Sequence, residues 1–169
     1  MENMERPQIS KLKSCDKMLG PWQSQLCDIQ GRLFENAGKA GYSSEQFIKQ
    51  FMTSSLAKEL DSTYNRMQWA GEEYLLEEFA DRCPAAPKDG NLYDNEVLYW
   101  AGYVYRYWHF LTGESSKEAP AETMNTNYLM FHCMDTELAI EDLKEIHRQK
   151  AKKRSKSGRK AMPDRIQSD

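Results

Sequence analysis

The sequence predicts an all-α protein: a single compact domain of about six or seven helices with a basic C-terminal tail. Apolar residues recur at intervals of three and four along most of the chain, which is the repeat of one helical face. Only six prolines and nine glycines occur in 169 residues, and 40% of the residues are hydrophobic, enough for one core. We expect a flexible lead-in at 1–20, the helical domain at 21–148, and a disordered tail at 149–169.

The first four expected helices follow from local start and stop signals. Pro21 suits the first position of a helix, whose apolar stripe runs from Trp22 to Ala37. Ser43 and Gln46 form a capping-box pair that opens the second helix. A short third helix ends near Asp61, and a fourth is expected over 66–83, where two prolines follow.

The fifth helix is expected over 94–112, and the rest of the domain is organised around it. Val97, Ala101, Val104, Trp108 and Leu111 recur at helical spacing. Asp94 suits the N-cap and Gly113 the C-terminal stop. Because the other sides of this helix are also aromatic, we expect it to lie among other helices. Two further helices are expected between 120 and 148.

Composition excludes several classes of protein. No secretory signal and no run of about 20 apolar residues occurs, so we expect a cytoplasmic protein without a membrane span. The four cysteines are scattered without a CxxC pair. The adjacent His132 and Cys133 are more typical of packing than of a metal site, which needs about four ligands. We expect no metal and no cofactor, since no nucleotide-binding or hydrolase motif occurs.

The charge is divided unevenly along the chain. Residues 147–160 hold eight Lys or Arg and no acid, whereas the rest of the chain is strongly acidic. Such a tail can neutralise phosphates and bind nucleic acid without reading its sequence. The alternative is a tail that only increases solubility. If the tail binds nucleic acid, the residues expected to contact the phosphates are Lys152, Lys153, Arg154, Lys156, Arg159 and Lys160.

Arg106 and His109 lie three residues apart on the central helix and so share one side of it. This resembles the catalytic pair of helical nucleases of the HEPN type, in which four to six residues separate the arginine from the histidine. Here only two residues intervene, which argues against a shared mechanism. The alternative is structural: Arg106 pairs with an acid from the fourth helix, and His109 is an interior or rim residue.

One side of the central helix calls for another explanation, because core packing already accounts for the Val97–Leu111 stripe. This second side of the helix carries Tyr99, Tyr103, Arg106, Tyr107 and Phe110. Aromatic and arginine side chains often dominate protein interfaces.

Two neighbouring segments are expected to share a site with that side. They are the Glu-rich fourth helix, with Glu72 and Glu73, and the loop over 112–118. The carboxylates of the fourth helix otherwise form a solvated face or an acidic surface for a basic partner.

Three stretches resemble a family of small, mostly uncharacterised bacterial all-helical proteins: GYSSEQFIKQFMTSSLAKELDSTYNRMQWAGEEYLLEEF, YWAGYVYRYWHFLTGESSKE and AETMNTNYLMFH. The resemblance covers about residues 23–146. That family is associated with toxin–antitoxin-like neighbourhoods, which implies an accessory or neutralising role. The resemblance supplies no catalytic motif.

The sequence therefore favours a non-enzymatic interaction module, an antitoxin-like protein that binds and neutralises a cognate toxin. The alternative is a nucleic-acid-associated protein or helical ribonuclease that uses the tail and the Arg106–His109 pair. A weaker third hypothesis is a sensor of small ligands with a pocket of Tyr and Trp. Homodimerisation through the central helix is a further expectation.

Overall fold

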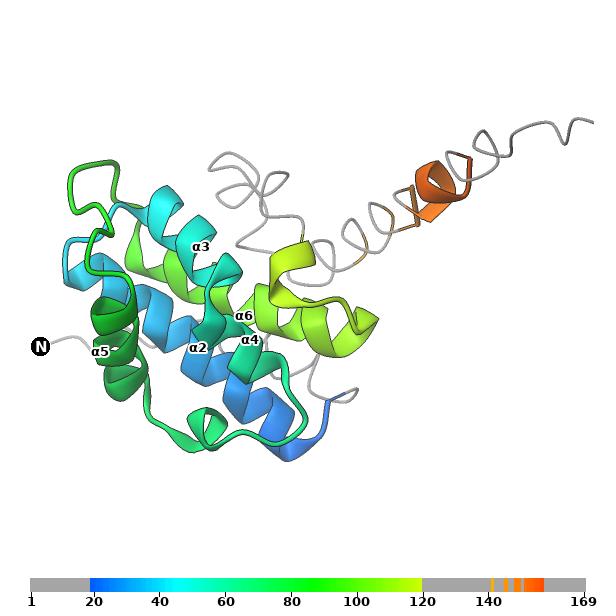
Figure 1. Ribbon diagram of the computed structural model, residues 1–169, viewed down its shortest axis with the longest axis horizontal. Helices are drawn as coiled ribbons and strands as arrows, with labels where there is room; N and C mark the ends of the chain where they lie inside the picture. The colour runs from blue at the N-terminus through cyan, green and yellow to red at the C-terminus, as the bar shows by residue number, and fades with distance from the viewer. Residues whose placement is uncertain (1–18, 120–140, 142–144, 146–147, 150, 157–169) are drawn as a thin grey trace, which may run out of the picture.

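The computed structural model describes residues 19–119, 141, 145, 148–149 and 151–156 (Figure 1). These residues confirm the expected all-α class, and no strand occurs among them. The elements between residues 19 and 119 are α2 (Pro21–Lys39), α3 (Ser44–Thr53), α4 (Ser55–Asp61), η2 (Arg66–Trp69), α5 (Glu72–Arg82), α6 (Asn95–Thr112) and η3 (Ser116–Glu118). None of the described helices has the length and apolar character that crossing a membrane requires.

Helices α2 and α6 form the centre of the fold and run side by side in opposite directions (Figure 1). The ring of Trp22 at the start of α2 meets that of Phe110 near the end of α6, with centroids 5.5 Å apart. At the crossing Gly31 lies against Gly102: a Cβ on Gly102 would come 2.9 Å from the Gly31 Cα and would clash with the carbonyl oxygen of Gln30. The absence of two side chains thus lets the backbones approach closely.

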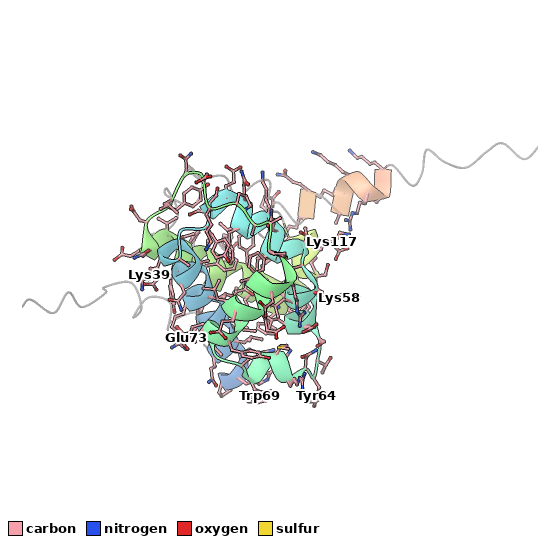
Figure 2. All side chains as sticks on the ribbon, turned by 60° about the vertical axis from the view of Figure 1, so that its left-hand side comes forward. Lys39, Lys58, Tyr64, Trp69, Glu73 and Lys117 are labelled. Carbon is pink, nitrogen blue, oxygen red and sulfur yellow. The ribbon has the colours of Figure 1, made fainter. Side chains whose placement is uncertain are left out.

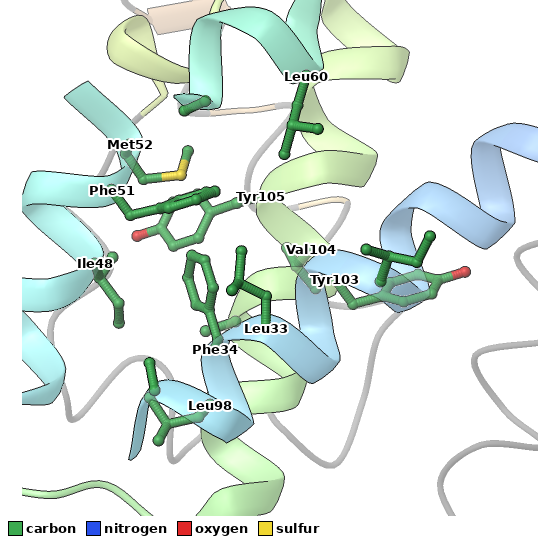
Figure 3. Packing of buried hydrophobic residues seen from close by; sticks show 14 of the residues in the cluster. Leu33, Phe34, Ile48, Phe51, Met52, Leu60, Leu98, Tyr103, Val104 and Tyr105 are labelled. Atoms are coloured by element: carbon green, nitrogen blue, oxygen red, sulfur yellow. The ribbon is translucent and has the colours of Figure 1, made fainter. Parts of the chain in front are cut away.

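Helices α3, α4 and α5 complete the core around this pair. Phe34 of α2 packs edge-to-face on Phe47 and Phe51 of α3, with centroids 5.4 Å apart in both pairs. The ring centroid of Phe79 on α5 lies 4.9 Å from that of Phe47. On the other side, Tyr105 of α6 enters the same core (Figure 3). The core therefore has contributions from all five helices between residues 19 and 112.

Helix α6 confirms the expected central helix almost residue for residue. Asp94 is its N-cap, and Gly113 follows it with φ of 72°, the left-handed conformation that glycine adopts without strain. Every residue from Val97 to Trp108 is buried. The burial extends around the whole helix, as its aromatic composition predicts.

Several expectations about the elements need correction. The expected helix over 66–83 is two elements, η2 and α5, separated by Ala70 and Gly71. Ser43 does not cap α3 through its hydroxyl; its backbone N–H instead donates to the carbonyl of Pro87. Trp22, expected in the core stripe of the first helix, is 41% exposed.

The remaining predictions concern the two ends of the chain. Residues 1–18 and nearly all of 120–147 lie outside the described residues, so the lead-in and the last two expected helices are not described. We expected disorder throughout 149–169. Residues 151–156 are nevertheless helical and exposed, because their run of Lys, Arg and Ala favours helix without supplying an apolar face.

We expect Gly102→Ala to destabilise the protein by about 1–3 kcal/mol, because the new methyl group meets backbone atoms of α2 that cannot rotate away. The measurement is the free energy of unfolding in urea. Gly71→Ala is the matched control: only a Glu73 carboxylate oxygen, 3.7 Å away, lies near its added Cβ, and the expected loss is below about 1 kcal/mol. Equal losses for the two variants would contradict the close crossing.

Candidate functional site

The side chain of Arg106 is fully buried, with 0% exposure, and joins three helices. Its Nε donates to Oε1 of Gln30 on α2 at 2.9 Å, and one terminal nitrogen contacts Oδ1 of Asp61 on α4 at 2.6 Å. The Gln30 amide in turn donates to the Gly102 carbonyl of α6 at 2.9 Å. A buried charge is tolerated only when it is paired and hydrogen-bonded, and this one is both.

The loop after α6 folds back onto the same group. The backbone N–H of Ser116 donates to Oδ2 of Asp61 at 2.7 Å, and its hydroxyl donates to Oδ1 at 2.6 Å. The second terminal nitrogen of Arg106 reaches the Ser116 hydroxyl at 3.3 Å. The loop thus joins a site with the Arg106 side of α6, as the sequence suggested, whereas α5 contributes no residue to it.

The expected structural partner of Arg106 was an acid from the helix predicted over 66–83. The acid that pairs with it is Asp61, the last residue of α4. Burial lowers the pKa of the Arg106 guanidinium, and Asp61 opposes that shift by stabilising the charged form. Because its donors face Gln30, Asp61 and Ser116, the guanidinium is not accessible to a substrate.

His109 is a partly buried neighbour of this network, with 15% of its side chain accessible. Its Nδ1 donates to the carbonyl of Glu114 at 2.7 Å and lies 3.6 Å from Oδ1 of Asp61. Trp108 holds the same loop by donating from Nε1 to a carboxylate oxygen of Glu114 at 2.9 Å. The surroundings of His109 and Arg106 therefore match the structural alternative better than the nuclease pair.

The side of α6 that we expected to bind a partner is covered within the chain. Tyr99, Tyr103, Arg106 and Tyr107 are buried, and Phe110 is partly exposed. The Tyr99 hydroxyl donates to Asp28 of α2. These residues hold α6 in place, and their burial gives no support to the surface role that their residue types suggested.

The two acids predicted to contact a partner differ from each other. Glu72 pairs with Arg32 of α2 at 3.2 Å, and its side chain is only 15% exposed. Glu73 is exposed and has no salt bridge among the described residues (Figure 2). Only Glu73 is therefore available to a partner as the sequence analysis expected.

A surface that the sequence analysis missed lies at the opposite end of α6 from its N-cap. Trp22 is 41% exposed, Tyr64 is 92% exposed and Trp69 is 76% exposed. Figure 2 shows Tyr64 and Trp69 at the same end of the molecule. Trp22 and Trp69 both line a notch of about 50 Å³. We call Trp22, Tyr64 and Trp69 the aromatic patch.

The short helix η2 explains why Trp69 lies outside. Asn65 caps η2 by accepting from the Met67 N–H at 2.9 Å, and the Gln68 amide donates to the Leu60 carbonyl at 3.1 Å. Met67 and Gln68 are buried and attach η2 to the body. A single turn of 3-10 helix cannot bury every side chain, so Trp69 points to solvent.

The signal for this arrangement was present in the sequence. The polar run Ser62–Asn65 and the small pair Ala70–Gly71 flank residues 66–69. Such residues are typical of turns and breaks. They indicate a separate short element instead of the first turn of a long helix.

The basic residues of the tail are partly described. Lys152, Lys153, Arg154 and Lys156 are exposed and helical. Arg159 and Lys160 lie outside the described residues. The charged groups of the described part of the tail are therefore accessible to a phosphate or a carboxylate.

The described residues contain no group of three or more His, Cys, Asp or Glu side chains that could hold a metal ion. Among them, Cys27 and Cys83 are not in disulfides. Cys15, Cys133 and His132 fall outside the described part of the chain.

Comparison of the chain with protein-family models, curated proteins and solved structures found no match.

We expect Arg106→Ala to destabilise the protein by about 3–5 kcal/mol, because it leaves Asp61 with an uncompensated, largely buried charge. The free energy of unfolding in urea measures the effect.

Arg82→Ala is the matched control. Arg82 also pairs with an acid of α4, Glu59, at 2.8 Å, but both side chains are about 30% exposed. We expect a loss of at most about 1 kcal/mol there. A small loss for Arg106→Ala would show that the buried network does not hold the helices together.

Proposed function

We propose that this protein is a non-enzymatic interaction module that binds and neutralises a cognate protein through the aromatic patch. The observation that carries the proposal is the exposure of Trp69 and Tyr64, at 76% and 92%, in a chain that buries most of its other aromatic rings. Exposed apolar patches with a polar rim are typical of protein interaction sites. Tryptophan and tyrosine are among the residues that dominate binding energy.

The patch is preorganised for binding. The Trp22 ring is fixed by its edge-to-face contact with Phe110, at an interplanar angle of 78°. The hydrogen bonds of Asn65 and Gln68 anchor the backbone of η2, which carries Trp69. Rigid aromatic groups lose little conformational entropy on binding, which favours affinity.

The energetics favour a protein partner. A buried aromatic side chain removes roughly 150–250 Å² from water, at about 25 cal/mol per Å². Covering Tyr64 and Trp69 thus supplies on the order of 5–10 kcal/mol before the cost of association. The notch between Trp22 and Trp69, at about 50 Å³, is far below the roughly 300 Å³ of a small-molecule pocket. It fits the tip of a partner's side chain.

The kind of partner comes from the resemblance of the chain to helical proteins of toxin–antitoxin-like neighbourhoods. We infer that the partner is a toxin encoded beside this protein, and that covering the toxin blocks its action. This role requires no catalytic residue. It is compatible with an Arg106–His109 pair whose groups are engaged in the fold.

We expect Trp69→Ala and Tyr64→Ala each to weaken binding of the neighbouring gene's product by about 30-fold, since loss of a central aromatic residue costs about 2 kcal/mol. Calorimetry with the purified pair measures this. Co-expression in a host that the neighbouring product poisons measures neutralisation.

Leu92→Ala is the matched control, because Leu92 is 58% exposed and lies in the loop between α5 and α6. It should bind and neutralise normally. If the wild-type protein neither binds the neighbouring product nor relieves its toxicity, the proposed function is wrong. If it binds and the Trp69 variant binds equally well, the patch is not the interface.

A further inference from the structure

Helix α5 carries five acids and one base, and its acids fall into two groups. Glu72 and Glu78 are engaged by Arg32 and Arg82. The remaining acids are exposed and have no salt bridge among the described residues: Glu73, Glu77 and Asp81. Their spacing of four residues places them on one side of the helix. The fold thus leaves a row of three carboxylates along α5.

Beside this row lies an open groove of about 470 Å³ between α5 and the end of α2. Glu73 and Glu77 line it together with apolar side chains that include Leu76 and Ala80. Its one cation, Lys88, lies over the Tyr42 ring, 4.9 Å from the centroid. Lysine side chains are complementary to such a surface, because their stems cover apolar groups while their charges reach the carboxylates.

The same chain holds a segment of the complementary chemistry. Residues 147–160 contain eight Lys or Arg and no acid. Within it, 151–156 is helical and exposed, and Lys152 and Lys156 lie one turn apart. Neither has a salt bridge among the described residues, whereas Arg148 pairs with Glu145 at 3.3 Å. A rise of about 1.5 Å per residue gives Lys152–Lys156 and Glu73–Glu77 the same spacing.

We infer that the basic segment of a second copy of this chain lies in the α2–α5 groove, with Lys152 and Lys156 against Glu73 and Glu77. In Figure 1 the described residues 151–156 and helix α5 lie on opposite sides of α2, α3 and α4. A neighbouring copy can therefore supply the segment without refolding of the body. Reciprocal exchange between two copies closes a two-fold dimer and leaves neither groove empty. This contact uses a different surface from the aromatic patch.

The first test is the mass of the full-length protein by sedimentation over a range of concentrations and at two salt concentrations. We expect a dimer at 0.1 M salt. Its dissociation constant should rise at least about tenfold at 1 M salt, where the screening length falls from about 10 Å to about 3 Å. A monomer at all concentrations, or a dimer that is indifferent to salt, overturns the inference.

The second test exchanges the charges. Glu73→Lys with Glu77→Lys makes the groove basic, and Lys152→Glu with Lys156→Glu makes the segment acidic. Each double variant alone should be monomeric. An equimolar mixture should form a heterodimer, because each segment then faces a groove of opposite charge. A single chain that carries all four changes should dimerise again.

The control changes net charge equally elsewhere: Glu45→Lys with Glu96→Lys, two exposed acids on α3 and α6. This variant should dimerise like the wild type. A dimer that survives reversal of the segment overturns the inference, as does a mixture that stays monomeric. So does a segment reversal that abolishes binding of a random RNA oligonucleotide and leaves the mass unchanged.

Discussion

The buried ion pair between Arg106 and Asp61 is the interaction on which the arrangement of helices depends. It joins α6 to α4, and through Gln30 and Ser116 it reaches α2 and the loop after α6. Removing any one member leaves the others desolvated without a partner, so the group acts as a unit. The ion pair also limits how the helices can be oriented relative to one another. The planar guanidinium forms its hydrogen bonds in few orientations, whereas apolar side chains can shift more easily against each other.

Much of the fold could be predicted from the sequence where local signals and periodicity agree. Helix α6 has both, from Asp94 to Gly113, and its bounds were correct. The 66–83 segment was misread as one helix because the break that Ala70 and Gly71 indicate was passed over. The hydrogen bond from the Gln68 amide to the Leu60 carbonyl, which attaches η2 to the body, has no such local signal. Periodicity also cannot identify the neighbours of a helix, so Tyr103 and Tyr107 were expected to contact a partner although the chain itself covers them.

The sequence likewise identified some residues of the candidate sites and missed others. Arg106 and the loop with Ser116 were singled out from residue types alone, yet their partner Asp61 lies 45 residues from Arg106 and could not be identified without the fold. The exposed Trp69 was missed because a tryptophan usually belongs to a core. What distinguishes it is the shortness of its helix, which the residues flanking 66–69 indicate and the residue type of Trp69 does not.

The close crossing of α2 and α6 also has a consequence for biosynthesis. Gly31 leaves the ribosome 71 residues before Gly102, the residue it packs against. At about 5–20 residues per second, the apolar face of α2 waits roughly 4–14 s for its cover. Of the helices that the structure describes, those made in that interval are α3, α4, η2 and α5. The order of elements along the chain thus allows the smaller helices to pack around Phe34 before α6 is synthesised.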